Sequence, residues 1–474
     1  MKITEKKITF GVVVGTRGFF NSKLAKNGRK DLLALLEKLD YNYVILPSDQ
    51  TPTGVIETVD DARKCAKLFN EHRDEIDGII VSLPNFGDEI GIVSTIDFAK
   101  LDVPVLVQAC DDENDKVSID ERRDAFCGKL SVCNNFYQYG IPFTDTAFHT
   151  CKIDSEVFAG DVQRFEKICR VTRGLSGARI GAIGARPAAF QTMRFSEKLL
   201  QATGITVVPV DMSEILGNAG RMDSSSSKVK QKVQEIHEYG NIPDSIPKDN
   251  ILKQAKFSVA AGEWIEANNI DAAAFQCWTS IQENYGCATC LTMSMLGEGL
   301  IPSACEVDVC GVVSMYAIAL ATGQPAALLD WNNNFAEERN KCVCTHCSNY
   351  PRSFVQNPIE ISNLDILGAT IGPEKCFGAI KGKVAAGPFT FFRISTDDEI
   401  GLIKGYVGQG DYTDDPYGMD GGIAVCEVDR LQDLMKTLCK NGFEHHVAMG
   451  REHVAEIILE ATSNYLGWEI YHHA

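Results

Sequence analysis

The stretch "ITFGVVVGTRGFFNSKLAKNGRKDLLALLEKLDYNYVILP", residues 8–47, decides the fold class of this chain. Its first eight residues, Ile8–Gly15, form an apolar run that predicts a buried strand. Arg29–Leu39 has apolar residues at helical spacing, and Tyr43–Pro47 is a second short apolar run. A strand, a helix and another strand in this order form the repeating unit of a parallel sheet.

The alternation continues along the first third of the chain. It predicts a helix over Asp60–Ile76, a strand over Gly78–Pro84, a helix over Val93–Lys100 and a strand over Val103–Ala109. Runs that are apolar throughout are typical of parallel strands, which helices cover on both faces. We therefore expect an N-terminal Rossmann-like α/β domain over residues 1–170.

The same pattern restarts after a helical stretch near residues 156–175. The predicted order is strand, helix, strand, helix, strand, over Ala178–Gly184, Met193–Thr203, Ile205–Asp211, Ile251–Asn269 and Ile270–Trp278. This indicates a second parallel-sheet domain over residues 171–357. From about residue 358 short apolar runs rich in Gly, Phe, Tyr and Val alternate with turn residues, which predicts a β-rich, barrel-like C-terminal domain over 358–474.

The composition excludes several classes of partner. The chain has 474 residues, 46 basic and 64 acidic, and a net charge of −18. This acidic surplus argues against nucleic acid and against an anionic membrane surface as partners, because both require a positive face. The first apolar run predicts a strand and not an export signal, so we expect a cytoplasmic protein. Its 17 cysteines are then mostly unpaired core residues.

Two carboxylates stand out because strongly apolar sequence surrounds them. Glu306 precedes the apolar helix predicted over Val309–Ala321, and Asp330 ends the buried strand predicted over Pro325–Asp330. A buried lone carboxylate is unfavourable unless a cation or a hydrogen-bonded partner accompanies it. The alternative is that Glu306 is a charge at a helix N-terminus and Asp330 a turn former, and spacing alone favours that alternative.

The stretch "GFEHHVAMGREH", Gly442–His453, carries three of the nine histidines. Two oxygen donors and one neutral imidazole would suit a divalent ion such as Mn²⁺ or Mg²⁺. The alternative is a surface helix with solvated rings. We expect His453, His472 and His473 to be solvated.

Four short stretches together carry a resemblance to a known family. They are "AFQCWTS" (Ala274–Ser280), "ACEVD" (Ala304–Asp308), "LLDWN" (Leu328–Asn332) and "HH" (His445–His446), in this order. The chain resembles the L-fucose isomerase and L-arabinose isomerase superfamily, and most closely its fucose-isomerase-like branch. The resemblance implies two Rossmann-like domains followed by a β-rich domain, and a Mn²⁺ site, with Mg²⁺ or Co²⁺ as alternatives, formed by Glu306, Asp330 and His446.

The resemblance also implies a reaction, aldose–ketose isomerisation through a cis-enediol. Glu306 and Asp330 are then the catalytic pair, one moving the proton from C2 to C1 and the other handling the hydroxyl proton. The sugar would be contacted by Gln276, Trp278 and His445. Arg17 would come from a neighbouring subunit of a homo-oligomer, which the resemblance implies to be a hexamer.

The sequence leaves alternatives open for both the substrate and the class of protein. The substrate is an L-fucose-type or modified hexose, and the alternative within the family is the sulfonated hexose sulfoquinovose. A sulfonate would require a cation, for which Arg17, Arg186 and Arg194 are candidates. A non-enzymatic sugar-binding protein is the rival class, because tandem α/β domains are also its architecture.

A second metal hypothesis rests on "CVCTHCSNYP", Cys342–Pro351. Its Cys342, Cys344 and Cys347, together with His346, are zinc-ligand types, and Cys287 and Cys290 supply a further C-x₂-C pair. The "HCSN" part of this stretch also resembles a loop that lines the pocket of the isomerase family.

Overall fold

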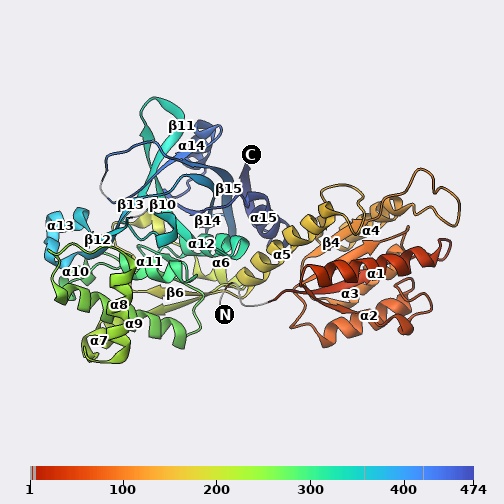
Figure 1. Cartoon of the computed structure of the whole chain (residues 1–474), viewed down its shortest axis with the longest axis horizontal. Helices are drawn as coiled ribbons and strands as arrows, with labels where there is room; N and C mark the ends of the chain where they lie inside the picture. Colours follow the sequence, from red (N-terminus) through yellow and green to blue (C-terminus); the bar gives the residue numbers. More distant parts are fainter. Residues whose placement is uncertain (1–2, 4–6, 357, 420) are drawn as a thin grey trace. The chain divides into compact units, whose positions relative to one another are not determined.

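The computed structural model describes residue 3 and residues 7–356, 358–419 and 421–474. These residues form two compact units (Figure 1). The N-terminal unit comprises residues 7–173 with Glu460–Gly467, and the C-terminal unit comprises Gly174–Leu459 with Trp468–Ala474. None of the helices in the described ranges combines the length and apolarity that crossing a membrane requires.

The N-terminal unit is built on a five-stranded parallel sheet in the order β2-β1-β3-β4-β5. Its strands are β1 (Thr9–Val14), β2 (Asn42–Ile45), β3 (Gly78–Leu83), β4 (Val105–Ala109) and β5 (Thr144–Asp145). Its helices are α1 (Ser22–Lys38), α2 (Val59–Glu71), α3 (Glu89–Ala99), α4 (Ala125–Tyr139) and α5 (Glu156–Ser176), with a 3₁₀ turn at η1 (Ser48–Gln50) and a π-helical segment at η5 (Glu460–Tyr465).

Helices cover both faces of this sheet, as the apolar runs predicted. Along β1, Phe10 and Val12 pack with residues of α1 and α5, whereas Val13 packs with residues of α2, α3 and α4. Alternate side chains of a strand point to opposite faces, so a strand buried on both faces is apolar throughout. Helix α1 begins seven residues before the predicted start because Asn21 caps it, accepting a hydrogen bond from the Lys23 amide at 3.0 Å.

The C-terminal unit contains a four-stranded parallel sheet in the order β7-β6-β8-β9. Its strands are β6 (Arg179–Ile183), β7 (Thr206–Val210), β8 (Ala272–Phe275) and β9 (Ser303–Ala304). The helices that accompany it are α6 (Glu197–Ala202), α7 (Met212–Arg221), α8 (Ser227–Tyr239), α9 (Lys248–Ala267), α10 (Ser280–Asn284), α11 (Cys290–Glu298) and α12 (Val309–Thr322), with a short turn at η2 (Gln191–Met193). Helix α6 starts later than predicted because Ser196 caps it.

A nine-stranded mixed sheet forms the rest of this unit, in the order β12-β13-β16-β11-β10-β17-β14-β15-β18. Strand β16 pairs with β11 on one side and with β15 on the other, so six of the strands close into a ring. This is the predicted barrel-like part. The strands are β10 (Ala326–Phe335), β11 (Glu338–His346), β12 (Glu360–Asn363), β13 (Phe377–Lys383), β14 (Gly387–Asp397), β15 (Leu402–Thr413), β16 (Gly422–Glu427), β17 (His446–Gly450) and β18 (Glu469–His473).

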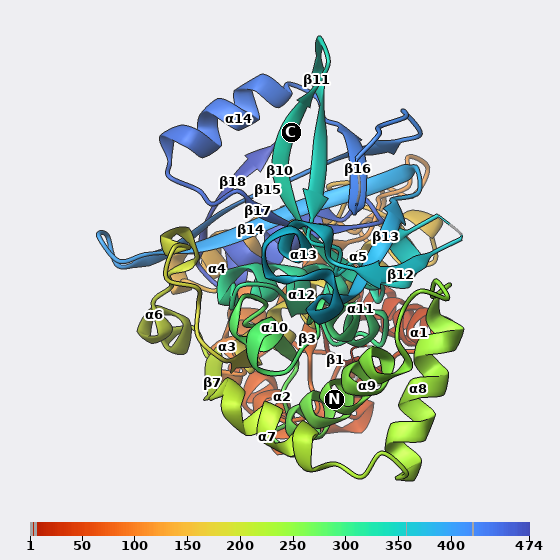
Figure 2. The ribbon, with the colours of Figure 1, turned by 90° about the vertical axis from the view of Figure 1, so that its left-hand side faces the viewer.

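The remaining elements are α13 (Asp365–Ile371), α14 (Leu431–Lys440), α15 (Ala455–Leu459), η3 (Arg352–Phe354) and η4 (Pro373–Lys375). Strand β10 continues for five residues beyond Asp330 and, with β11, forms a hairpin that projects from the sheet (Figure 2). The mixed sheet therefore takes in strands that precede residue 358. The division of the chain into three domains stays a prediction.

Helix α12 lies between the parallel sheet and the mixed sheet, with contacts to β8, β10, β14 and β17. Each of its residues from Val309 to Ala321 is buried. A helix that is buried on all sides must be apolar on all sides, and the sequence predicts an apolar helix over Val309–Ala321. The N-terminus of α12 therefore lies where the two sheets meet.

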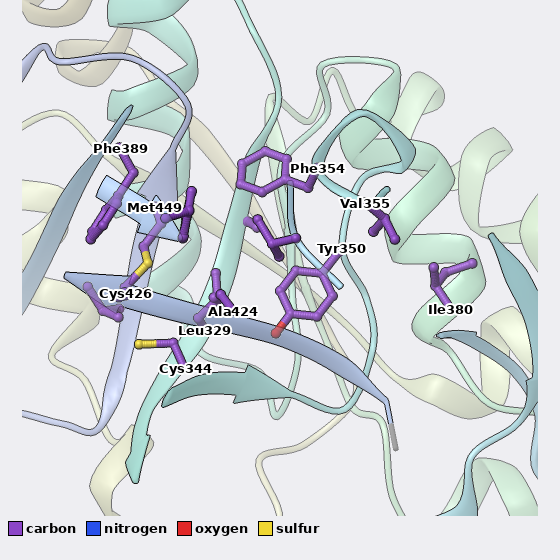
Figure 3. Packing of buried hydrophobic residues seen from close by; sticks show 14 of the residues in the cluster. Leu329, Cys344, Tyr350, Phe354, Val355, Ile380, Phe389, Ala424, Cys426 and Met449 are labelled. Atoms are coloured by element: carbon purple, nitrogen blue, oxygen red, sulfur yellow. The ribbon is translucent and has the colours of Figure 1, made fainter. Parts of the chain in front are cut away.

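The barrel is filled by a continuous apolar cluster that includes Leu329, Tyr350, Phe354 and Met449 (Figure 3). Gly422 on β16 is required by this packing, because a Cβ there would lie 1.6 Å from a ring carbon of Tyr350. The expectation that His473 is solvated is wrong. It is buried at the end of β18, where its Nε2 lies 2.7 Å from the carbonyl oxygen of Asp429.

Candidate active site

Three neighbouring strands of the mixed sheet bring together side chains that are far apart in the sequence. Asp330 on β10 is directly opposite His446 on β17 and opposite Thr345 on β11. His346 follows Thr345 at the end of β11. The pairing register therefore places one carboxylate and two imidazoles at adjacent positions. His446 is part of a buried strand, so the alternative of a surface helix is wrong.

Glu306 reaches the same place from the other sheet. It lies in the tight turn between β9 and α12, and the φ angles of Glu306 and Val307 are 55° and 54°. Left-handed backbone is uncommon for residues other than glycine, above all for a β-branched one, and such strain concentrates at functional sites. The turn directs Glu306 toward the barrel strands, and the indole Nε1 of Trp278 donates a 3.1 Å hydrogen bond to its Oε1.

Four ligand-type atoms converge at this point. Oε2 of Glu306 lies 3.2 Å from Nε2 of His446 and 3.6 Å from Nε2 of His346. Oδ1 of Asp330 lies 3.4 Å from Nε2 of His446 and 4.0 Å from Nε2 of His346. The two Nε2 atoms are 3.4 Å apart. Both carboxylate oxygens are buried and have no hydrogen-bond partner among the described residues. Buried anionic oxygens that face imidazole nitrogens without a hydrogen bond are the surroundings that a divalent cation completes.

Burial and charge shift the pKa values of these groups. Burial alone would raise the pKa of Glu306, but the adjacent imidazoles of His346 and His446 lower it well below its usual value. Burial would lower the pKa of His446, but the carboxylates of Asp308 and Glu306 raise it to about 10. Without a metal ion, these shifts keep the carboxylate of Glu306 ionised and hold a proton on the imidazole of His446. A cation would take that proton's place, because a metal-bound imidazole is neutral on the coordinating nitrogen.

A second layer of buried charges orients His446. Its Nδ1 donates to Oδ2 of Asp308 at 2.8 Å, which leaves Nε2 directed at the carboxylates of Glu306 and Asp330. Asp308 also accepts from the amide of Gly311 at 2.8 Å, which caps α12, and from the guanidinium of Arg393. Arg393 in turn lies 3.3 Å from Glu444. Burial raises the pKa of Asp308. The positive charge of Arg393 and, to a smaller extent, His446 outweigh this effect and hold the pKa below its usual range.

Aromatic rings form one wall of the site. The ring of Phe190 lies 5.3 Å from that of Trp278 and 5.8 Å from that of His445. His445 is partly exposed, with Nε2 at 4.0 Å from Oδ1 of Asp330. The side-chain oxygen of Gln276 accepts from the amide of Ala185 at 3.0 Å, so this glutamine also anchors the loop that carries Phe190. The structure thus brings Trp278 and His445 to the cluster, and their contact with a sugar stays a prediction.

The arginines named as sulfonate ligands have other contacts. Arg17 belongs to the N-terminal unit, where it pairs with Glu89 and stacks on the Phe86 ring at 4.3 Å. Its predicted role in a neighbouring subunit's site stays a prediction. Arg186 donates to the carbonyl oxygens of Pro187 and Phe190, and Arg194 donates to that of Gln191, so both arginines hold their own loop.

The cysteines of the zinc hypothesis are divided between two cores. Cys342 and Cys344 lie on β11 inside the barrel cluster, whereas Cys347 packs against the cluster that contains Cys287 and Cys290. His346 belongs to the carboxylate–imidazole cluster. Among the described residues, the groups whose ligand atoms all lie within 4.8 Å of one another are Glu306 with His346 and His446, and Asp330 with His445 and His446. Neither group includes a cysteine.

Comparison with known proteins agrees with this geometry. The model of the fucose/sulfoquinovose isomerase N-terminal domain matches residues 11–176, and that of the L-fucose isomerase C-terminal domain matches residues 344–473. The chain is 26% identical over 394 residues to the sulfoquinovose isomerase of Priestia aryabhattai, covering 81% of this chain and 83% of that relative. It is 26% identical over 313 residues to the sulfoquinovose isomerase of Clostridium sp. (strain MSTE9), covering 65% and 66%.

A solved periplasmic solute-binding protein from Actinobacillus succinogenes 130z with bound D-allose has 10% identity and a TM-score of 0.17, covering 67% of this chain and 93% of that one. A TM-score of 0.17 does not indicate a shared fold. The chain belongs to the L-fucose isomerase and L-arabinose isomerase superfamily, in its fucose-isomerase-like branch. It is an intramolecular oxidoreductase, an aldose–ketose isomerase.

Proposed function

We propose that this isomerase converts a sulfonated hexose of the sulfoquinovose type, with a divalent metal ion, Mn²⁺ in the first place, held by Glu306, Asp330, His346 and His446. The similarity to sulfoquinovose isomerases over 81% of the chain supports this substrate above an L-fucose-type sugar. The metal proposal rests on the convergence of four ligand atoms, two of which are buried carboxylate oxygens without a hydrogen bond to the described residues. The homo-oligomer, the contribution of Arg17 and the cytoplasmic location stay predictions.

The donor set fits a hard or borderline cation. Two carboxylates and two imidazoles, with no thiolate, suit Mn²⁺, Mg²⁺ or Co²⁺. When bound, such an ion supplies a Lewis acid that polarises the sugar carbonyl and makes the neighbouring C–H proton removable. The hydrogen bond that Nδ1–H of His446 donates to Asp308 fixes the imidazole ring, as partners of metal-binding imidazoles commonly do.

The two carboxylates are the proposed acid–base pair. Asp330 is about one-fifth exposed and lines a cavity, so its carboxylate can reach a sugar bound there. Glu306 is buried. Trp278 donates to its Oε1, and its Oε2, the proposed metal ligand, faces the imidazoles of His346 and His446. One carboxylate takes the proton from C2 and returns it to C1, and the other moves the hydroxyl proton. Reach to the reacting atoms is the first requirement for such a role.

The direct test is metal-dependent exchange of the C2 hydrogen. The purified protein is treated with chelator, reloaded with Mn²⁺, Mg²⁺ or Co²⁺, and incubated with sulfoquinovose or L-fucose in D₂O. We expect deuterium at C2 of sulfoquinovose and formation of its ketose with Mn²⁺, and loss of both on chelation.

Two results would contradict the proposal. Exchange that survives complete removal of metal would exclude the metal site as the catalyst. Metal-dependent exchange on L-fucose without any on sulfoquinovose would overturn the proposed substrate while leaving the isomerase intact.

In the sequence His346 stands among cysteines, but in the structure it lies beside Glu306 and His446. This position leads to a separate prediction about Mn²⁺ affinity. Replacing His346 by glutamine should lower Mn²⁺ affinity by more than the roughly 10- to 100-fold that follows loss of an outer partner. Calorimetric titration of the chelated protein with Mn²⁺ measures this. The matched control is His72→Gln, an exposed histidine of the N-terminal unit. Equal affinity in both variants would remove His346 from the ligand set.

A further inference from the structure

One cavity of the C-terminal unit is lined both by two of the candidate metal ligands and by a charged pair. It has a volume of about 170 Å³, and its lining includes Asp330 and His346 together with Asp365 and Lys381. Lys381 is the only lysine or arginine among the described residues that line it. A substrate whose carbonyl end meets the metal ligands would therefore extend toward this lysine.

The sheet places Lys381 at a fixed separation from the metal cluster. Lys381 and Ala379 lie on the same face of β13, and both line the cavity. The next residue, Gly382, pairs with Gly422 of β16, which pairs with His346 of β11. Two strand spacings, about 10 Å between backbones, thus separate the lysine from the imidazole. A long side chain on that strand can meet the far end of a hexose whose first two carbons lie at the cluster.

Lys381 has a carboxylate partner in the absence of a ligand. Asp365, the first residue of α13, forms an ion pair with its Nζ. The lysine side chain is about one-quarter exposed and that of the aspartate more than half exposed. Partly exposed pairs of this kind contribute little to stability, so a ligand anion can replace the carboxylate at modest cost.

The lining of the cavity also includes a side-chain oxygen without a hydrogen-bond partner. The side-chain oxygen of Asn363 is buried and has no hydrogen-bond partner among the described residues. Asn363 ends β12 and lines the cavity beside Leu364. An acceptor of this kind requires a donor such as a sugar hydroxyl, because an unmade buried hydrogen bond is unfavourable. A sugar hydroxyl bound in the cavity would supply the donor that this oxygen lacks.

We infer that Lys381 binds the anionic group at the far end of the substrate, and that Asp365 holds the lysine until the substrate arrives. The inference rests on the proposed function, because it assumes that the carbonyl end of the sugar lies at Glu306, Asp330, His346 and His446. A sulfonate at C6 then takes the place of the aspartate beside the lysine. Lys381 is a specificity-determining residue and takes no part in the proton transfers.

The charges make opposite predictions for the two members of the pair. Lys381→Gln removes a charge-assisted hydrogen bond to the sulfonate, so KM for sulfoquinovose should rise about 10- to 100-fold with kcat changed much less. Asp365→Asn removes a competitor for the lysine and a like charge near the sulfonate. KM should then fall about two- to fivefold. Lys381→Arg keeps the charge and should restore most of the affinity.

The experiment measures KM and kcat for sulfoquinovose on the metal-loaded enzyme, and the inhibition constant of the same sugar lacking the sulfonate. The inhibition constant of this neutral analogue should be unchanged in Lys381→Gln, because only the anionic contact is lost. Lys436→Gln, an exposed lysine on α14, is the matched control. A structural role for Lys381 would instead raise both constants together and would not be rescued by arginine.

Three results would overturn the inference: an unchanged KM in Lys381→Gln, a parallel rise of the inhibition constant, or a raised KM in Asp365→Asn. Each is seen only in variants. Failure of the proposed substrate is seen in the unmodified enzyme, as absence of turnover of sulfoquinovose, and is therefore distinguishable.

Discussion

Replacement of Glu306 by glutamine will abolish isomerisation. The substitution keeps the size of the side chain and its hydrogen bond from Trp278, but it removes the negative charge that His346 and His446 face. It therefore removes a metal ligand and one member of the proposed acid–base pair in a single change. Loss of a general base alone lowers turnover by about 10²- to 10⁴-fold, so we expect kcat to fall at least about 10³-fold.

The matched control for this variant is Glu337→Gln in the hairpin between β10 and β11. Its side chain is 93% exposed, so it carries the same change of charge in solvent, and its activity should equal that of the unmodified enzyme. Circular dichroism and thermal unfolding confirm that each variant is folded before kcat is measured. A folded Glu306→Gln enzyme with undiminished turnover would refute the assignment of this residue.

Replacement of Arg393 by methionine will have the largest effect on stability. Arg393 is 1% exposed and lies between two buried carboxylates, Asp308 and Glu444. Methionine fills part of the space but leaves both carboxylates without their cation, and breaking a buried pair in this way typically costs about 3–5 kcal/mol. Denaturant unfolding of the metal-free protein measures the loss. The orientation of His446 should suffer as well, because Asp308 contacts both residues.

Two companion variants separate the charge from the packing. Arg339→Met, in the exposed hairpin beside Glu337, removes an arginine from a surface pair and should change the free energy of unfolding by less than about 1 kcal/mol. The double variant Arg393→Met with Glu444→Gln removes one of the orphaned charges and should recover part of the stability. If Arg393→Met unfolds like the unmodified protein, the buried network is not a stabilising feature of the fold.

Much of the fold follows from local sequence patterns. The all-apolar runs, such as the one over Ile8–Gly15, predict strands covered on both faces, and the strands of both parallel sheets lie where such runs occur. Helix α12 is apolar at every position, and its central burial follows directly from that. The glycine-rich and aromatic-rich C-terminal third predicts short strands, which the structure closes into a ring.

The site was only partly accessible to the same reasoning. Glu306, Asp330 and His446 could be named because they lie in recognisable stretches, and the structure brings them together. His346 was named only as a zinc-ligand type and as part of a stretch that resembles a pocket-lining loop, because its cysteine neighbours suggested zinc. In the structure Thr345 is opposite Asp330, and Nε2 of His346, the next residue, lies 4.0 Å from Asp330 Oδ1. Pairing between distant strands is not encoded in any local pattern.

One overlooked signal was present in the sequence. Arg393 stands in the otherwise apolar and hydroxylic stretch "FTFFRIS", and a charge within a buried strand requires a partner of opposite charge. That partner, Asp308, lies two residues after Glu306. The turn between β9 and α12 has left-handed backbone at Glu306 and Val307. The sequence does not signal this turn, because neither of these two residues is a glycine.

A single crystallographic measurement tests the central claim most directly. Crystals of the protein loaded with Mn²⁺ are measured at the manganese absorption edge, and an anomalous difference map locates the ion without reference to any ligand assignment. The account predicts one strong peak within bonding distance of Glu306 Oε2, Asp330 Oδ1, His346 Nε2 and His446 Nε2. A peak at another place in the chain, with these four atoms away from any metal ion, would contradict it.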